Sequence, residues 1–180
     1  MGNRGCLHGA EGAIRRSFAN KSWITCTLRE KPGRGAHPFP VPGRWTPLFF
    51  LDEAVACAAG HRPCAECRRA VYNAFRAAWR LAFGTVPKAV EIDAALHEAR
   101  LGPQLRALAG DLPPGAFILW QGQPHLRGDS SALPYLAGDY QSAVPLPKAE
   151  VEVLTPAPLL AVMRAGWRPA MELAADRPNW

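Results

Sequence analysis

The amino-acid sequence predicts an α+β protein in which a small loop-rich module precedes helices and a region of short antiparallel strands. Three observations support this prediction. The first 50 residues are rich in Gly, Pro and Arg and contain one strand-like run, residues 52–109 contain segments with helical spacing, and strand-like runs follow the Pro-Pro-Gly turn at 113–115. We therefore expect a module at 1–85 and a C-terminal α+β region at 86–180, packed as one compact unit.

Composition and charge set broad limits on the class of protein. The chain has 180 residues, 48% of them hydrophobic, which is enough for one sizeable core. It lacks an apolar run long enough to span a bilayer, and its start lacks the apolar segment of a secretory signal, so we expect a soluble cytoplasmic protein without a membrane partner. A net charge of +6 and a pI near 9.4 favour an acidic partner, nucleic acid before membrane.

The first predicted elements are a strand and a short helix. Residues 22–28 are rich in β-branched and aromatic side chains and predict a strand, and 31–47 read as a loop. Asp52 is a suitable N-cap for a helix over 52–59, which Gly60 ends. The Ala-Gly-His-Arg-Pro phrase here has a later counterpart, Ala-Gly-Trp-Arg-Pro, after another apolar helical stretch. Part of the phrase is therefore interpreted as a helix-ending signal.

A longer helix is predicted from Cys64 or Ala65 to Phe83, where Gly84 ends it. At about 100° per residue, one side of this helix is apolar. That side comprises Val71, Phe75, Ala78, Trp79 and Ala82. The opposite side is cationic, because three arginines fall within roughly 40° of one another. They are Arg69, Arg76 and Arg80.

Beyond this helix the pattern predicts further helices and then strands. Helices are expected at 89–101 and, as a shorter one, at 103–109. The expected strands are 116–121, 124–127 and 151–154, and a last helix follows at 157–165.

Cys64 and Cys67 form a C-x-x-C pair, a spacing that lets two thiolates bind one metal ion. A tetrahedral site needs two further ligands, and we select Cys6 and Cys26, with His8 as the alternative to Cys6. The other candidates are His37, His61 and Cys57, of which Cys57 is expected to be a core residue. A structural Zn²⁺ would organise the loop-rich first 50 residues. A redox pair or two ordinary cysteines are the alternatives.

Residues 50–54 (FLDEA) and 58–67 (AAGHRPCAEC) resemble the N-terminal zinc-binding domain of the Ada DNA methylphosphotriester repair protein. In that family an E-A-x-x-A-G-aromatic-R-P-C-x-x-C phrase supplies the last two of four zinc thiolates. The resemblance, over about residues 50–67, implies an Ada-like zinc module associated with DNA, with Cys64 and Cys67 as ligands and Arg62 near the phosphate backbone.

The sequence also departs from that family. The first two thiolates there come from a C-x-x-x-C segment that includes the methyl acceptor, whereas Cys6 and Cys26 are 20 positions apart here. Methyl transfer is therefore not carried over; were it retained, Cys26 would be the acceptor. The leading hypothesis is a zinc-binding protein that binds DNA through a basic helix face, with DNA repair as the process. The arginines expected to contact phosphates are Arg62, Arg68, Arg69, Arg76 and Arg80.

A second group of residues gives the alternative hypothesis. Asp93, His97 and Arg100 stand at i, i+4 and i+7 of a predicted helix and so share one face. Asp93 could orient His97 for acid–base chemistry while Arg100 holds an anion. The alternative is therefore an enzyme with a structural zinc and these three catalytic residues, acting on a small anionic or nucleotide-like substrate. A salt-bridge ladder without catalytic function is the competing interpretation, and a plain protein-interaction module is a third.

Overall fold

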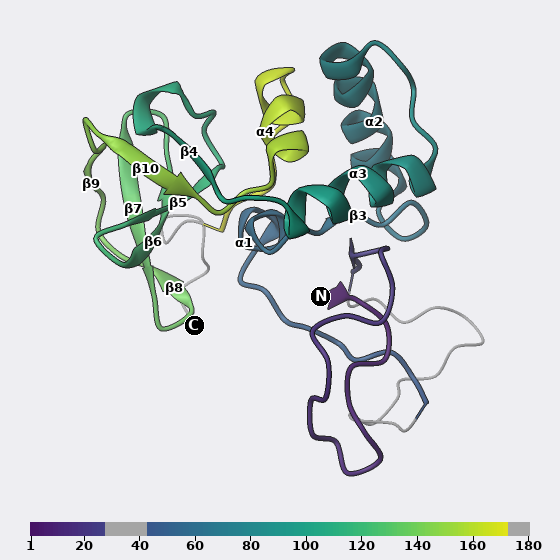
Figure 1. Ribbon diagram of the computed structural model, residues 1–180. Helices are drawn as coiled ribbons and strands as arrows, with labels where there is room; N and C mark the ends of the chain where they lie inside the picture. The colour runs from purple at the N-terminus through teal and green to yellow at the C-terminus, as the bar shows by residue number, and fades with distance from the viewer. Residues whose placement is uncertain (28–42, 173–180) are drawn as a thin grey trace.

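The computed structural model describes residues 1–27 and 43–172 (Figure 1). The described chain is mixed α/β. Its helices are α1 (Glu53–Ala58), α2 (Arg69–Phe83), α3 (Ala89–Leu101) and α4 (Ala157–Arg164), with a 3-10 turn η1 (Ala109–Asp111). None of the helices in this part of the chain is long and apolar enough to cross a membrane.

The strands form two sheets. Two-residue strands β1 (Gly2–Asn3), β2 (Ile24–Thr25) and β3 (Arg62–Pro63) make the small sheet, in which β1 and β2 are antiparallel while β2 and β3 are parallel. The large sheet is antiparallel, with the order β4-β10-β5-β6-β7-β8, and β9 pairs with β7. Its strands are β4 (Leu105–Leu108), β5 (Phe117–Trp120), β6 (Gln123–Arg127), β7 (Ser131–Leu136), β8 (Asp139–Tyr140), β9 (Val144–Pro145) and β10 (Glu150–Val153).

Helix α4 lies between the large sheet and the other long helices, as Figure 1 shows. Its Leu159 and Val162 join a core with α2 and α3, whereas Leu160 joins the core over the sheet. Helix α1 packs against another part of the sheet through Ala54, which is buried with Phe117. The helical core thus combines residues from both sides of position 85.

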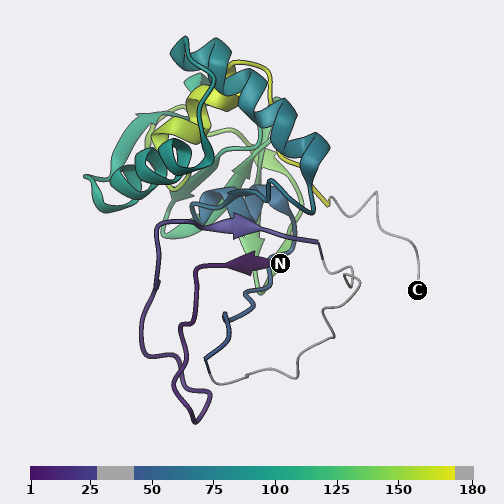
Figure 2. The ribbon, with the colours of Figure 1, turned by 90° about the vertical axis from the view of Figure 1, so that its right-hand side faces the viewer.

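The segments 1–27 and 43–50 extend away from the helices and the large sheet, below α1 and β3 in Figures 1 and 2. We call these segments the N-terminal lobe. Backbone hydrogen bonds hold its chain segments together, for example Arg15 N to Leu7 O at 2.8 Å and Thr46 N to Gly5 O at 3.0 Å. The lobe joins the rest of the molecule through the small sheet, because β3 follows α1 directly.

Several predicted elements are confirmed. The bounds of α3 are those predicted, and Asp52 caps α1 by accepting a hydrogen bond from Val55 N at 2.9 Å. Helix α2 ends at Gly84, whose φ is +79°, and it buries Phe75, Ala78 and Trp79 as expected. The strands predicted at 116–121, 124–127 and 151–154 correspond to β5, β6 and β10, and the last helix to α4.

Two predictions were wrong. The segment 103–109 is not a helix: it contains β4, because β10 supplies an antiparallel partner for all four residues of that strand. Helix α2 begins at Arg69 and not at Cys64 or Ala65, because the C-x-x-C pair occupies a turn before the helix. The strand at 22–28 is limited to β2 among the described residues.

Candidate metal centre

The thiols of Cys26, Cys64 and Cys67 converge, with their Sγ atoms all within 4.8 Å of one another. The parallel pairing of β2 with β3 brings Cys26 and Cys64 together, because each cysteine directly follows its strand. The register aligns Thr25 with Pro63, and Cys64 N donates to Thr25 O at 2.9 Å. Two segments separated by almost 40 residues therefore deliver thiols to the same edge of the small sheet.

The turn between Cys64 and Cys67 directs both thiols to one place. Arg68 N donates to Cys64 O at 3.2 Å and closes the turn. Backbone amides also point at the sulfurs, with Glu66 N 3.4 Å from the Sγ of Cys64 and Thr27 N 3.4 Å from the Sγ of Cys67. Such N–H donors stabilise thiolate charge, as in a metal-binding knuckle.

The three thiols influence one another's ionisation. Burial raises the pKa of the Cys26 thiol, and the neighbouring Cys64 and Cys67 raise it further. Burial also raises the pKa of Cys64, but hydrogen bonds from the amides of Cys67 and Glu66, together with those from the Cys67 and Cys26 thiols, outweigh it, so the pKa lies below its ordinary value. Three thiolates this close repel one another, and a cation bound among them would remove that repulsion. The cluster could therefore hold a metal ion.

The structure brings together three of the four predicted ligands. Within residues 1–27 and 43–172 neither Cys6 nor His8 joins the group. Cys6 stays in the lobe, where its Sγ donates to His8 O at 3.6 Å, and the buried His8 lies 2.6 Å from Thr46 Oγ1. Cys57 is buried in the helical core as expected, and His37 lies outside the described residues.

The arginines predicted to contact DNA fall into two groups. Arg62 is only 4% exposed, and its Nε and Nη2 donate to the two carboxylate oxygens of Asp93 at 2.7 and 2.9 Å. The Arg62 guanidinium is therefore buried in a bidentate ion pair, which leaves it little surface for a phosphate. Arg68 also forms an ion pair, with its Nη1 2.7 Å from the carboxylate of Glu53.

The other three predicted arginines lie on α2. Arg69 and Arg80 are exposed, and neither forms an ion pair with a residue of the described chain. Arg76 is half-buried, and its Nε donates to Pro87 O at 2.9 Å. The helix contains no acidic residue. Its outer side therefore carries positive charge that no carboxylate of the same helix neutralises.

The predicted Asp93, His97 and Arg100 do share α3 but have separate partners. Asp93 pairs with Arg62 and accepts from the Ser22 hydroxyl.

Arg100 donates to Gly60 O at 2.8 Å and to Lys21 O at 3.0 Å, and lies 3.5 Å from His97 Nδ1. Desolvation and the charge of Arg100 lower the pKa of His97. The geometry therefore gives Asp93 and Arg100 structural partners, and no hydrogen bond or ion pair joins Asp93 to His97 in the described structure.

Sequence reasoning missed Glu53 and Arg4, both of which support this region. Glu53 is buried, pairs with Arg68 and accepts from Ala170 N at 3.0 Å. Arg4 lies over Trp23, 3.8 Å from its ring centre, with Arg100 at 4.0 Å from the same ring. Both residues act across long sequence separations, so the sequence shows neither partner, although Glu53 stands within the Ada-like phrase.

No family model matches this chain, and the comparisons found no similar curated protein and no similar solved structure. A three-thiol donor set is soft and suits Zn²⁺, Cu⁺ or an iron–sulfur cluster better than Mg²⁺ or Ca²⁺.

Proposed function

We propose that this chain is a zinc-binding protein that binds DNA through the exposed arginines of α2. The convergence of Cys26, Cys64 and Cys67 is the observation that carries the zinc part of the proposal. Zinc is favoured among the soft ions because a C-x-x-C turn with amide donors on its sulfurs is typical of tetrahedral zinc sites. The zinc would hold the N-terminal lobe against the start of α2.

The DNA part of the proposal is supported by charge. Arg69, Arg76 and Arg80 lie within roughly 40° on α2, and the half-buried Arg76 borders its core, 5.8 Å from the ring centre of Tyr72. Phosphate contacts from exposed arginines give binding that falls steeply with salt. DNA repair is the process implied by the Ada-like phrase, and alkylated DNA is accordingly the substrate to test after plain DNA.

The zinc assignment is tested by the metal content of purified protein. We expect one zinc per chain in the wild type, and a loss of nearly all of it in Cys64→Ser with Cys67→Ser. Cys57→Ser is the matched control, because Cys57 is a buried thiol outside the cluster. Copper or iron in place of zinc, or equal metal loss in the control, would overturn the assignment.

The DNA assignment is tested by fluorescence anisotropy of labelled DNA at several salt concentrations. Replacing two exposed arginines, in Arg69→Glu with Arg80→Glu, should weaken binding at least about tenfold and lower the salt slope by about one for each phosphate that the variant no longer neutralises. Lys148→Glu with Arg164→Glu makes the same change of charge on exposed residues elsewhere. Equal binding by the two double variants would contradict a role for α2.

A further inference from the structure

The net charge of the protein is confined to one end of the chain. Residues 1–50 contain eight Lys or Arg and two Asp or Glu, which gives +6. Residues 51–180 contain thirteen of each sign and are neutral overall. The whole net charge of +6 thus belongs to the first 50 residues, which include the N-terminal lobe.

Exposed cations are spread over the described part of this lobe. Arg15, Arg16, Lys21 and Arg44 are all exposed. Adjacent chain segments carry three of them, because Arg15 N bonds to Leu7 O and Leu7 N bonds to Thr46 Oγ1 at 2.8 Å, close to Arg44. Arg15 pairs with the exposed Glu11 at 3.0 Å, an interaction that water and salt weaken. The described lobe has no other acidic residue.

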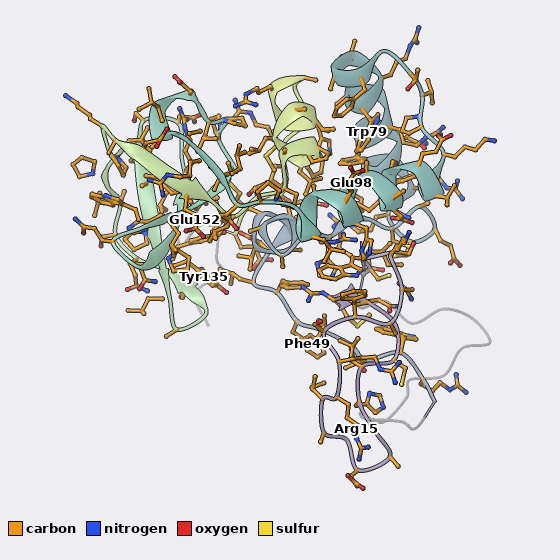
Figure 3. The ribbon with its side chains drawn as sticks, in the orientation of Figure 1. Arg15, Phe49, Trp79, Glu98, Tyr135 and Glu152 are labelled. Carbon is orange, nitrogen blue, oxygen red and sulfur yellow. The ribbon has the colours of Figure 1, made fainter. Side chains whose placement is uncertain are left out.

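The lobe also exposes aromatic rings. Among the described Phe and Trp residues only Trp45, Phe49 and Phe83 are exposed, and two of the three belong to the lobe. Phe49 is 70% exposed and Trp45 is 37% exposed. Other aromatic residues of the lobe contact rings within the protein. Phe18 packs on Trp23, and Phe50 packs on His61. Figure 3 shows Phe49 and Arg15 in the lobe, well separated from Trp79 on α2.

We propose that the N-terminal lobe binds single-stranded nucleic acid. Its exposed cations, Arg15, Arg16, Lys21 and Arg44, contact the phosphates, and Trp45 and Phe49 stack on the bases. Exposed cations and exposed aromatic rings on one lobe match the way proteins bind single strands, because unpaired bases offer their faces for stacking. In a duplex those faces are covered by neighbouring base pairs. This inference rests on the proposed nucleic-acid function, and it adds a second surface and a preference for unpaired strands.

The test compares variants of the full-length zinc-loaded protein. Arg16→Glu with Lys21→Glu removes lobe charge, and Lys148→Glu with Arg164→Glu is the control with the same change of charge. A labelled single-stranded oligonucleotide, the matching duplex and inorganic polyphosphate are the three probes. Zinc content and the unfolding temperature are measured for every variant, so that loss of folding is recognised. The charge-reversed lobe should bind the single strand at least about tenfold more weakly and show a salt slope smaller by about 1.4.

A second pair of variants tests the aromatic rings. Trp45→Ala with Phe49→Ala should weaken single-strand binding by about fivefold or more, as expected when stacking is removed. The same variant should bind polyphosphate as the wild type does. Leu81→Ala with Leu136→Ala is the control, because both leucines are exposed apolar residues outside the lobe.

The outcomes separate this inference from the proposed function. If the lobe variants bind the single strand as the wild type does while the α2 variant does not, the inference is overturned and the proposed function stands. Loss of binding in the lobe variants alone supports the inference and overturns the role of α2. Absence of nucleic-acid binding by the wild type at low salt overturns both. Equal affinity for single strand, duplex and polyphosphate, unaffected by the aromatic substitutions, overturns the single-strand preference.

Discussion

At the residue scale, His61 is a fully buried titratable side chain near the thiol cluster. It has no exposed surface, and Arg4 Nε donates to its Nε2 at 3.3 Å. With Nε2 as acceptor, the ring proton is on Nδ1, which donates to Ala56 O at 3.2 Å. Burial and the charge of Arg4 lower the pKa of His61 to about 3. The imidazole is therefore a neutral bridge between the N-terminal lobe and α1.

This constraint predicts a pH dependence of stability. The unfolded chain binds a proton at His61 near the ordinary pKa of 6.5, and the folded protein does so near 3, so acid favours unfolding. The destabilisation is absent well above pH 6.5 and grows as the pH falls toward 3. Between about pH 7.5 and about pH 5.5 the free energy of unfolding should drop by about 1.4 kcal/mol more in the wild type than in His61→Gln. Urea unfolding of both proteins at matched zinc content measures this difference. An equal change of unfolding free energy with pH in the two proteins would contradict the prediction.

The buried pair of Arg62 and Asp93 gives a second prediction. Asp93→Asn leaves a buried guanidinium without its counter-charge and should cost about 3–5 kcal/mol of unfolding free energy. Arg106 and Glu150 form an exposed pair, 3.3 Å apart, and Glu150→Gln should cost less than about 1 kcal/mol. Chemical denaturation measures the unfolding free energy of the two variants and of the wild type. If Asp93→Asn lost no more unfolding free energy than Glu150→Gln, the buried pair would not stabilise the fold as its burial indicates.

At the element scale, the repeated Ala-Gly-x-Arg-Pro phrase ends a helix in both places. Gly60 has φ +82° and Gly166 has φ +99°, conformations that favour glycine. Gly60 N bonds to Cys57 O, and Gly166 N bonds to Met163 O in the same way. The two sites differ in their surroundings. A Cβ on Gly60 would lie 2.5 Å from Arg100 Cδ, whereas one on Gly166 would meet no atom within 4 Å.

Alanine substitutions at these two glycines should therefore differ. Both variants should lose about 1–2 kcal/mol of stability because of the left-handed backbone. Gly60→Ala must also displace Arg100 from Trp23, which should add about 1 kcal/mol because the cation–π interaction is broken. Thermal and urea unfolding of the pair measures the difference. Equal destabilisation would show that Arg100 moves aside without cost.

Elements with local signals were predictable from the sequence. Helix α3 has the predicted bounds because Pro87 and Gly102 mark its ends within a few residues. The strand β4 was missed because its partner β10 lies about 40 residues later, and β7 was not predicted at all. The candidate site was likewise predictable only where its sequence signal is local. The Cys64–Cys67 turn is a local motif, whereas the separation of Cys6 from it depends on how the lobe folds around Thr46.

At the scale of the whole molecule, several contacts attach the N-terminal lobe to the remainder. One is the thiol cluster, where Cys26 comes from the lobe and Cys64 and Cys67 precede α2. Others are the pairing of β2 with β3, the hydrogen bond from Arg4 to His61, and the stack of Arg4 and Arg100 on Trp23. Helices α2, α3 and α4 share a separate apolar core to which the described lobe contributes no residue. The lobe and this core should therefore differ in their response to metal loss.

Removal of the metal should loosen the lobe while the helical core persists. In Cys26→Ser we expect faster amide exchange within residues 1–27, because the lobe then loses the metal link to the start of α2 and keeps only its weaker non-covalent contacts. Exchange in α2, α3 and α4 should stay close to that of the wild type, since their packing is unchanged. Hydrogen exchange followed by mass spectrometry reads both regions in one experiment, with Cys57→Ser as the thiol control. A uniform increase across the whole chain would mean that the metal stabilises the entire fold, and no increase in residues 1–27 would mean that the lobe is held without it.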